Sequence, residues 1–214
     1  MRLDRGAFDR TRSHWWWRPG WCHGTRYVTW HLTFERASAL RAEAVRVGRL
    51  LSTVPMVDVV PAEWLHLTMT GVGFADDLES EVLDRIARRV IAGVASLRME
   101  PLSLNRLYLH REGLSLAAEP SPWLTELKRI QERAISAELG RPEGAAEPFH
   151  PHVSLAYFRG EVDLEALTDA LALAPPGALA VREPMVSLLE LGRDEQVYTW
   201  RVLAQQQLLG SAET

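Results

Sequence analysis

Two short motifs in this sequence combine an imidazole with a hydroxyl at a spacing of two residues. They are His66-Leu67-Thr68 and His152-Val153-Ser154. Each lies in an apolar run rich in strand-forming residues, and successive side chains of a strand point to opposite faces. The histidine and the hydroxyl of each motif should therefore share one face of a strand, and apolar residues should cover the other face.

This set of groups suits the cleavage of a phosphodiester by water. One histidine can take a proton from the attacking water and the other can give one to the leaving oxygen, because an unperturbed imidazole has a pKa of roughly 6.5. The hydroxyls of Thr68 and Ser154 can donate hydrogen bonds to the phosphate oxygens. If the two strands lie side by side, this chemistry requires neither a metal nor another cofactor.

The strands that carry the motifs belong to a longer pattern. Runs of β-forming residues predict strands over residues 27–34, 56–60, 64–70, 102–109, 114–118 and 152–158, and two long strands joined by a turn at residues 192–195. We expect the strand over 64–70 to close at Gly71 and Gly73. Several strands follow one another too closely for parallel crossovers, so we predict an α+β fold with antiparallel sheets rather than a doubly wound sheet.

Helices are expected between these strands. Apolar residues at helical spacing predict helices over residues 40–54, from 76–77 to about 94, from 122 to about 139, and over 163–173 before a break at 175–177. The second helix should be capped by Asp76 or Asp77. Ser121-Pro122 should open the third helix, and Gly140 should end it.

Composition excludes some classes of protein. The chain has 214 residues, 47% of them hydrophobic, which is enough for a substantial core. Its net charge of -4 argues against a grip on long nucleic acid, which needs a basic surplus. Cys22 is the single cysteine, and the first residues lead into no apolar run. We therefore expect a cytoplasmic monomer with no internal disulfide, secretory signal or membrane segment.

The chain divides by composition into three parts. Residues 1–25 are rich in Trp and Arg and sustain no period, so we expect an irregular N-terminal extension, followed by one domain over 26–205 and a C-terminal tail over 206–214. The cluster Trp15–Trp21 has two interpretations. We favour a latch that packs on the outside of the domain, and the alternative is a flap that stacks on a nucleobase.

The flanks of the two motifs resemble a known family. Residues Trp64–Phe74 and Phe149–Leu155 are similar to the two signature motifs of the 2H phosphoesterase superfamily, also called 2′-5′ RNA ligase-like or LigT-like proteins. The order of elements from about Tyr27 to Val202 fits that fold. The resemblance implies two pseudo-symmetric lobes of antiparallel sheet, with outer helices, around a central cleft.

The resemblance also implies an activity. Members hydrolyse 2′,3′-cyclic phosphates of nucleotides or RNA ends, or related 2′-5′ linkages, and some catalyse the reverse ligation. By analogy His152 is the base that activates water, His66 is the acid for the leaving oxygen, and Thr68 and Ser154 bind the phosphate. The expected partner is a nucleotide or a short RNA with a cyclic phosphate. Near-symmetry of the site would let the two histidines exchange roles.

Other residues are weaker candidates. Many relatives carry a basic residue shortly after the second motif, where this chain has Tyr157. Tyr157 and Tyr108 are candidates for stacking on a base, although either could belong to the core. His31-Leu32-Thr33 also fits the motif; we interpret it as a chance match, with His31 kept as a candidate for substrate binding. Further histidines carry no interpretable signal, namely His14, His23 and His110.

Two alternatives to this enzyme remain open. The first is a module that binds nucleotides or RNA in the same pocket without catalysis, which the acidic balance and Tyr157 favour. The second is a metal hydrolase that holds zinc with His66, His150 and His152, although neither motif contains a nearby carboxylate or cysteine.

Overall fold

The computed structural model describes residues 2–143, 148–173 and 177–210. The helices are α1 (Ser38–Leu51), α2 (Ser80–Val94), α3 (Pro122–Leu139) and α4 (Leu164–Ala172), with short 3-10 turns η1 (Ala62–Trp64) and η2 (Ala75–Asp77). The strands are β1 (Arg2–Arg5), β2 (Tyr27–Thr33), β3 (Val57–Val59), β4 (His66–Phe74), β5 (Arg98–Met99), β6 (Leu102–His110), β7 (Gly113–Ala118), β8 (His152–Phe158), β9 (Leu179–Val181), β10 (Met185–Gly192), β11 (Thr199–Gln207) and β12 (Leu209–Gly210).

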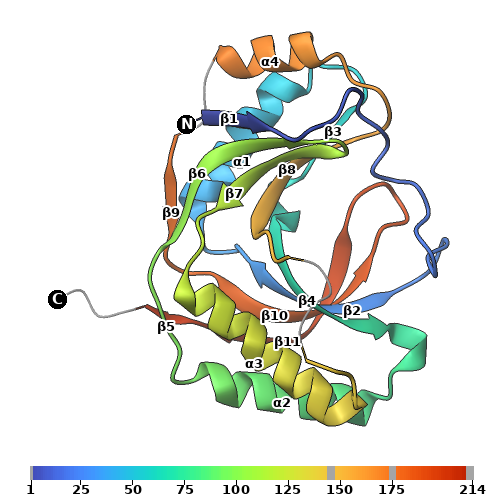
Figure 1. Cartoon of the computed structure of the whole chain (residues 1–214), viewed down its shortest axis with the longest axis vertical. Coiled ribbons are helices and arrows are strands. Elements are labelled where there is room, and N and C mark those ends of the chain that lie inside the picture. Colours follow the sequence, from blue (N-terminus) through green and yellow to red (C-terminus); the bar gives the residue numbers. More distant parts are fainter. Residues whose placement is uncertain (1, 144–147, 174–176, 211–214) are drawn as a thin grey trace.

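These elements form two lobes, each with a sheet and outer helices (Figure 1). One sheet has the strand order β1-β6-β7-β8-β3 with β9 beside β6, and the other has the order β11-β10-β2-β4. Helix α1 packs on the first sheet and on α4, whereas α2 and α3 pack together on the second sheet. In both sheets neighbouring strands are antiparallel, except for β1 beside β6. The α+β prediction and the two lobes are confirmed.

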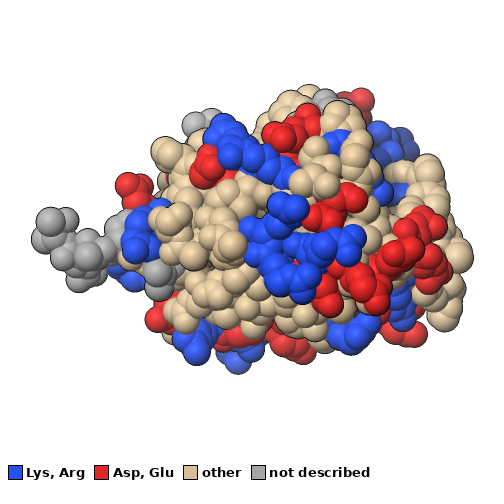
Figure 2. Space-filling view, turned by 90° about the horizontal axis from the view of Figure 1, so that it is seen from below, with Lys and Arg blue, Asp and Glu red and all other residues tan. Residues whose placement is uncertain are grey.

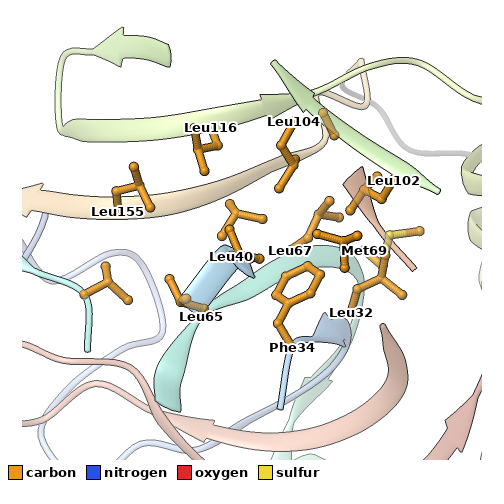
Figure 3. Close-up of a cluster of buried hydrophobic side chains, with 14 of the residues drawn as sticks. Leu32, Phe34, Leu40, Leu65, Leu67, Met69, Leu102, Leu104, Leu116 and Leu155 are labelled. Atoms are coloured by element: carbon orange, nitrogen blue, oxygen red, sulfur yellow. The ribbon is translucent and has the colours of Figure 1, made fainter. Parts of the chain in front are cut away.

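The apolar sides of the motif strands build the core. Leu65 and Leu67 are almost completely buried, and so is Leu155 of β8. They belong to one cluster with residues from β2, α1, β6 and β7 (Figure 3). Burying one such side chain contributes about 1.5–3 kcal/mol. The core therefore fixes which side chains of β4 and β8 point inward. His66 and His152 must lie on the other face of their strands.

Strand β4 differs from the prediction at its end. It runs through Gly71 and Gly73 to Phe74 instead of closing at these glycines. Gly71 is paired with Thr29 of β2, and a Cβ atom there would lie 2.7 Å from the hydroxyl oxygen of Tyr27. Glycine at position 71 therefore lets the Tyr27 side chain lie close to the backbone of β4.

The start of α2 was also predicted wrongly, whereas the ends of α3 are confirmed. Residues Ala75–Asp77 form η2, and α2 begins at Ser80 without a side-chain cap. Ser121 caps α3 by accepting a hydrogen bond from the backbone N–H of Leu124, and Gly140 ends it in the left-handed conformation, with φ +63°. The predicted break at 175–177 lies outside the described residues, apart from Gly177.

The two ends of the chain are more ordered than the sequence indicated. Arg2–Arg5 form β1 beside β6, so the expectation of irregular structure is wrong for these residues. Strand β11 continues to Gln207, and Leu209–Gly210 pair with β5. The division into three parts at residues 25 and 205 stays a prediction.

The outer surface of α2 and α3 carries both signs of charge (Figure 2). Arg85 and Arg89 of α2 both pair with Glu138 of α3, and Arg129 pairs with Glu126 within α3. Within the described ranges, no helix has both the length and the apolarity needed to cross a bilayer.

Candidate active site

A pocket of about 420 Å³ opens between the two lobes, and both motifs line it. His66 and Thr68 reach it from β4, and His152 and Ser154 reach it from β8. The two strands lie next to each other although they belong to different sheets. The four residues that the motifs predicted for the site therefore converge on one cavity.

The two motif histidines are oriented in the same way. Nδ1 of His66 lies 2.9 Å from the backbone oxygen of Trp64, and Nδ1 of His152 lies 2.8 Å from that of His150. A carbonyl oxygen only accepts hydrogen bonds, so Nδ1 must donate in both rings. In the neutral ring, Nε2 then carries a lone pair. Each imidazole can therefore offer Nε2 to a substrate in the pocket.

Burial keeps both histidines neutral in the free protein. It lowers the pKa of His66 from 6.5 to about 4, an effect that the hydrogen bond to Trp64 opposes and the neighbouring His152 reinforces. Burial also lowers the pKa of His152, again against its hydrogen bond to His150. Since a proton on one ring disfavours a proton on the other, a bound anion is needed to stabilise the protonated form.

His31, on the neighbouring strand β2, lies against His66. The two rings are stacked, with centroids 4.6 Å apart and planes inclined by 11°. His31 is paired with Thr68 in the ladder between β2 and β4, and it lines the pocket as well. Burial, and secondarily the charge of His66, lower the pKa of His31 well below 6.5. His31 is therefore part of the pocket wall, whereas Thr33 of the same tripeptide is buried and pairs with Ser187.

The two hydroxyls differ in their surroundings. Thr68 is exposed to the pocket, whereas Ser154 is buried and lines the pocket together with Tyr157. Burial raises the pKa of Tyr157 above its ordinary value of 10, so its hydroxyl stays protonated. Tyr157 lines the pocket at the position where the sequence departs from the family pattern.

Tyr108 lies outside this pocket, and His110 takes the place expected for it. Tyr108 lines a separate hollow beside Gly6 and Phe8. His110 is two residues further along β6, at the turn into β7, where the pocket begins. Its Nε2 lies 3.0 Å from the Ser115 hydroxyl, and its ring meets that of His152 edge to face at 5.4 Å. The candidate role of Tyr108 is therefore not supported by its location.

His14 joins the N-terminal residues to the pocket wall. Its ring stacks on Tyr157, with centroids 4.1 Å apart. Nδ1 lies 3.2 Å from a carboxylate oxygen of Glu112, which only accepts, so Nε2 must accept the hydrogen bond from the Tyr198 hydroxyl at 2.9 Å. Burial, followed by the charge of Arg18, lowers the pKa of His14 to about 3. This ring is neutral at neutral pH.

Part of the tryptophan cluster is indeed a latch. Trp15 is buried, and its indole N–H donates to Asp58 at 2.9 Å. Trp16 and Trp17 are exposed, while Trp21 lines the pocket together with Arg18. The segment therefore packs on the domain at Trp15 and lines the pocket at Trp21, and stacking on a nucleobase stays a prediction.

The alternative three-histidine zinc site is not formed. In the ranges that the structure describes, no three side chains of His, Cys, Asp or Glu come together as a group that could hold a metal. His150 contributes its backbone oxygen to the orientation of His152 instead.

Several pocket residues could not be found from the sequence. His14 and Arg18 come from the N-terminal segment, Glu112 and Tyr198 come from turns, and His110 ends β6. The first four stand in no motif and in no regular period, so no local signal identified them. His110 was the most accessible to inference, because it shares a strand face with Tyr108 at a spacing of two.

Known proteins resemble this chain in fold and in sequence. Escherichia coli LigT in its apo form superposes with a TM-score of 0.57, at 16% identity over 86% of this chain and 98% of LigT. The protein TT0787 of Thermus thermophilus also gives 0.57, at 18% identity over 86% of this chain and 99% of that protein. At these identities the likeness shows the fold.

A curated relative matches part of the sequence. The UPF0502 protein XOO0224 of Xanthomonas oryzae pv. oryzae (strain MAFF 311018) is 34% identical over 97 residues, which are 45% of this chain and 42% of that protein. The match thus spans less than half of either chain.

The pattern of the 2′-5′ RNA ligase superfamily matches residues 23–195. That range contains both motifs, α1 to α4 and β2 to β10, and it leaves out β1, β11 and β12. It leaves out residues 1–22, of which His14, Arg18 and Trp21 nevertheless line the pocket. This chain belongs to the 2′-5′ RNA ligase superfamily, a group of phosphoesterases and RNA ligases.

Proposed function

We propose that this protein is a metal-independent phosphodiesterase that hydrolyses 2′,3′-cyclic phosphates of nucleotides or RNA ends. The observation that carries the proposal is the matched orientation of His66 and His152, whose Nδ1 atoms are both engaged by backbone oxygens. Each ring thus has Nε2 available in a shared pocket with a hydroxyl beside it. An acid and a base on opposite sides of a phosphorus atom require such a pair.

In the proposed reaction, Nε2 of His152 takes a proton from water as the water oxygen bonds to phosphorus. The P–O bond to the 2′ or 3′ oxygen breaks, and that oxygen receives a proton from Nε2 of His66. Thr68 and Ser154 donate hydrogen bonds to the nonbridging oxygens as charge builds on them. The product is a nucleoside monophosphate, and the two histidines end with their protonation states exchanged.

The bound phosphate makes these protonation states attainable. His66 has a pKa of about 4 in the free protein and must be protonated to act as the acid. An anion between the rings favours the charged imidazole and raises its pKa. The substrate itself therefore helps to prepare the acid.

A solved relative supports the substrate class. Escherichia coli LigT was crystallised in complex with 3′-AMP, a nucleoside monophosphate. Its fold matches this chain with a TM-score of 0.57. A nucleoside phosphate is therefore the first substrate class to test.

The experiment is a panel of 2′,3′-cyclic nucleotides and 2′-5′ dinucleotides, assayed with and without a chelator. We expect turnover of at least one cyclic nucleotide at an unchanged rate in chelator, with the product identified as the 2′ or 3′ monophosphate. Turnover that stops in chelator would contradict the metal-independent reaction. Tight binding without turnover of any member would instead favour the non-catalytic binding module.

A further inference from the structure

The N-terminal segment, residues 14–21, is fastened to both lobes across the pocket. Arg193, in the turn after β10, donates to the backbone oxygens of His14 at 2.8 Å and Trp16 at 3.4 Å. Glu112, in the turn after β6 of the other sheet, accepts from Arg18 at 3.0 Å and from the indole N–H of Trp16 at 3.1 Å. The segment therefore bridges two turns that belong to different sheets.

Arg193 makes its contacts with the N-terminal segment from a buried position. Arg193 is 3% exposed, and its guanidinium lies 5.4–6.0 Å from the ring centroids of Trp15, Trp17, Trp21 and Tyr198. A desolvated cation against several rings, with backbone acceptors as well, is held firmly. The segment is therefore a fixed part of the pocket wall.

Arg18 gives the pocket a permanent positive charge. It is the one Lys or Arg among the described residues that line the cavity, within a protein whose net charge is -4. The histidines of the pocket are neutral in the free protein, so they do not provide this charge. Glu112, the partner of Arg18, also pairs with Arg12 and stays compensated when Arg18 turns toward an anion.

The end of the pocket beyond Thr68 is aromatic. Trp21 and Tyr27 line it, with ring centroids 5.9 Å apart and planes inclined by 29°. Along β4 this end is marked by Gly71, three residues after Thr68, which corresponds to about 10 Å of strand. That length accommodates a ribose and a base when the phosphate lies at Thr68.

We propose that Arg18 and Trp21 form a nucleoside phosphate subsite in which Arg18 binds the phosphate and Trp21, with Tyr27, packs against the base. The inference rests on the proposed function and narrows its substrate to small nucleoside phosphates. Arg18 and Trp21 precede the range that matches the superfamily, so both side chains of this subsite come from outside the matched range.

The first test compares two substrates of the full-length protein, adenosine 2′,3′-cyclic phosphate and a methyl riboside 2′,3′-cyclic phosphate without a base. Aromatic contact with a base contributes about 1–3 kcal/mol, so Trp21→Leu should raise KM for the adenosine substrate about tenfold and by much less for the riboside. Trp21→Phe should restore part of the difference. Arg18→Gln should raise KM for both substrates about equally.

A matched control comes from the same region. Arg10→Gln removes an exposed guanidinium that pairs with Glu161 and lies outside the pocket. This variant should keep the wild-type KM values. Equal changes of KM for the two substrates in Trp21→Leu, or wild-type KM values in Arg18→Gln, would overturn the subsite.

A binding measurement separates this inference from the hydrolysis itself. Calorimetric titration with adenosine 3′-monophosphate and with inorganic phosphate should show tighter binding of the nucleotide, a preference that Trp21→Leu reduces about tenfold. This pattern without turnover would sustain the subsite and contradict the hydrolysis. Turnover without a preference for the nucleotide would sustain the hydrolysis and contradict the subsite.

Discussion

The ring of His31 lies parallel to the ring of His66, with 4.6 Å between centroids. Both rings are buried and neutral, and a proton on His66 disfavours a proton on His31. The stack makes His66 part of a layer of imidazoles from β2 and β4 rather than a single side chain on a strand. The stacking should therefore affect both the stability of the fold and the catalytic rate.

The stacked pair should make the fold sensitive to acid. The pKa of His31 and of His66 is lower in the folded state than in the unfolded chain, where it is roughly 6.5. The unfolded chain therefore binds more protons between pH 6.5 and about 4, so stability is present above pH 6.5 and is lost as the pH falls. The thermal unfolding midpoint should be lower at pH 5 than at pH 7.5.

The variant His31→Phe tests this origin, because it keeps a stacked ring and removes the titrating group. Its midpoint should fall less between pH 7.5 and pH 5 than that of the wild type. His23→Phe, at an exposed position, is the control and should keep the wild-type difference. An unchanged acid sensitivity in His31→Phe would contradict the role of the stack.

The pH dependence of the rate should differ between the free and the bound protein. Because burial lowers the pKa of both motif histidines, the form with one proton on the pair becomes scarce above pH 6.5. We expect kcat/KM, which reports the free protein, to fall about tenfold per pH unit on its alkaline side. The alkaline limb of kcat should lie at higher pH, since the bound anion raises the pKa values. A constant kcat/KM between pH 6 and pH 9 would contradict this scheme.

The division of labour between His66 and His152 can be tested with the leaving group. His66→Asn and His152→Asn keep an amide that can donate to the backbone oxygen and remove Nε2, so each should lower kcat for a cyclic nucleotide by about 10²–10⁴-fold. With a 4-nitrophenyl phosphodiester, whose leaving group needs no proton, the His66 variant should recover most of the loss. If the His152 variant recovers instead, the two roles are exchanged.

The hydroxyls of the motifs should contribute to the rate rather than to folding. Thr68→Val is nearly isosteric and should lower kcat about 10²-fold, the loss typical of one donor to a developing oxyanion. Ser154→Ala should lower it similarly. Thr199→Val, at an exposed position of β11, should keep the wild-type rate. Equal rates in Thr68→Val and the wild type would remove Thr68 from the site.

Arg193 should hold the N-terminal segment in place. Arg193→Met removes two hydrogen bonds from a buried cation and its contacts with four rings, for an expected loss of about 2–4 kcal/mol in the free energy of unfolding. Limited proteolysis should then cut within residues 10–22. Arg201→Met is the control, since that side chain is 69% exposed and its pair with Glu190 should matter little. A wild-type cleavage pattern in Arg193→Met would show that other contacts suffice.

Strand patterns were a good guide to the motif face of the site. His66, Thr68, His152 and Ser154 were placed correctly because alternation in β4 and β8 forces them away from the apolar core. The helix caps at Ser121 and Gly140 followed from equally local chemistry. The predicted start of α2 was wrong because Asp76 and Asp77 are good caps but lie in a tight turn before the helix.

Local patterns could not identify contacts between distant segments. Strand β1 pairs with β6 although more than ninety positions separate them, and Arg18 meets Glu112 across a similar distance. Tyr108 was chosen over His110 because periodicity gives the face of a strand and not how far along it a pocket extends.

The sequence by itself determined which side chains could do chemistry and which face of their strands they would occupy, because alternation between core and solvent depends only on neighbours in the chain. Only the tertiary structure decided that two sheets bring β4 and β8 together, that His31 stacks on His66, and that Arg193 and Glu112 fasten the tryptophan segment to the pocket. These relationships depend on packing between segments far apart in sequence, whose hydrophobic and charged patterns do not specify their partners.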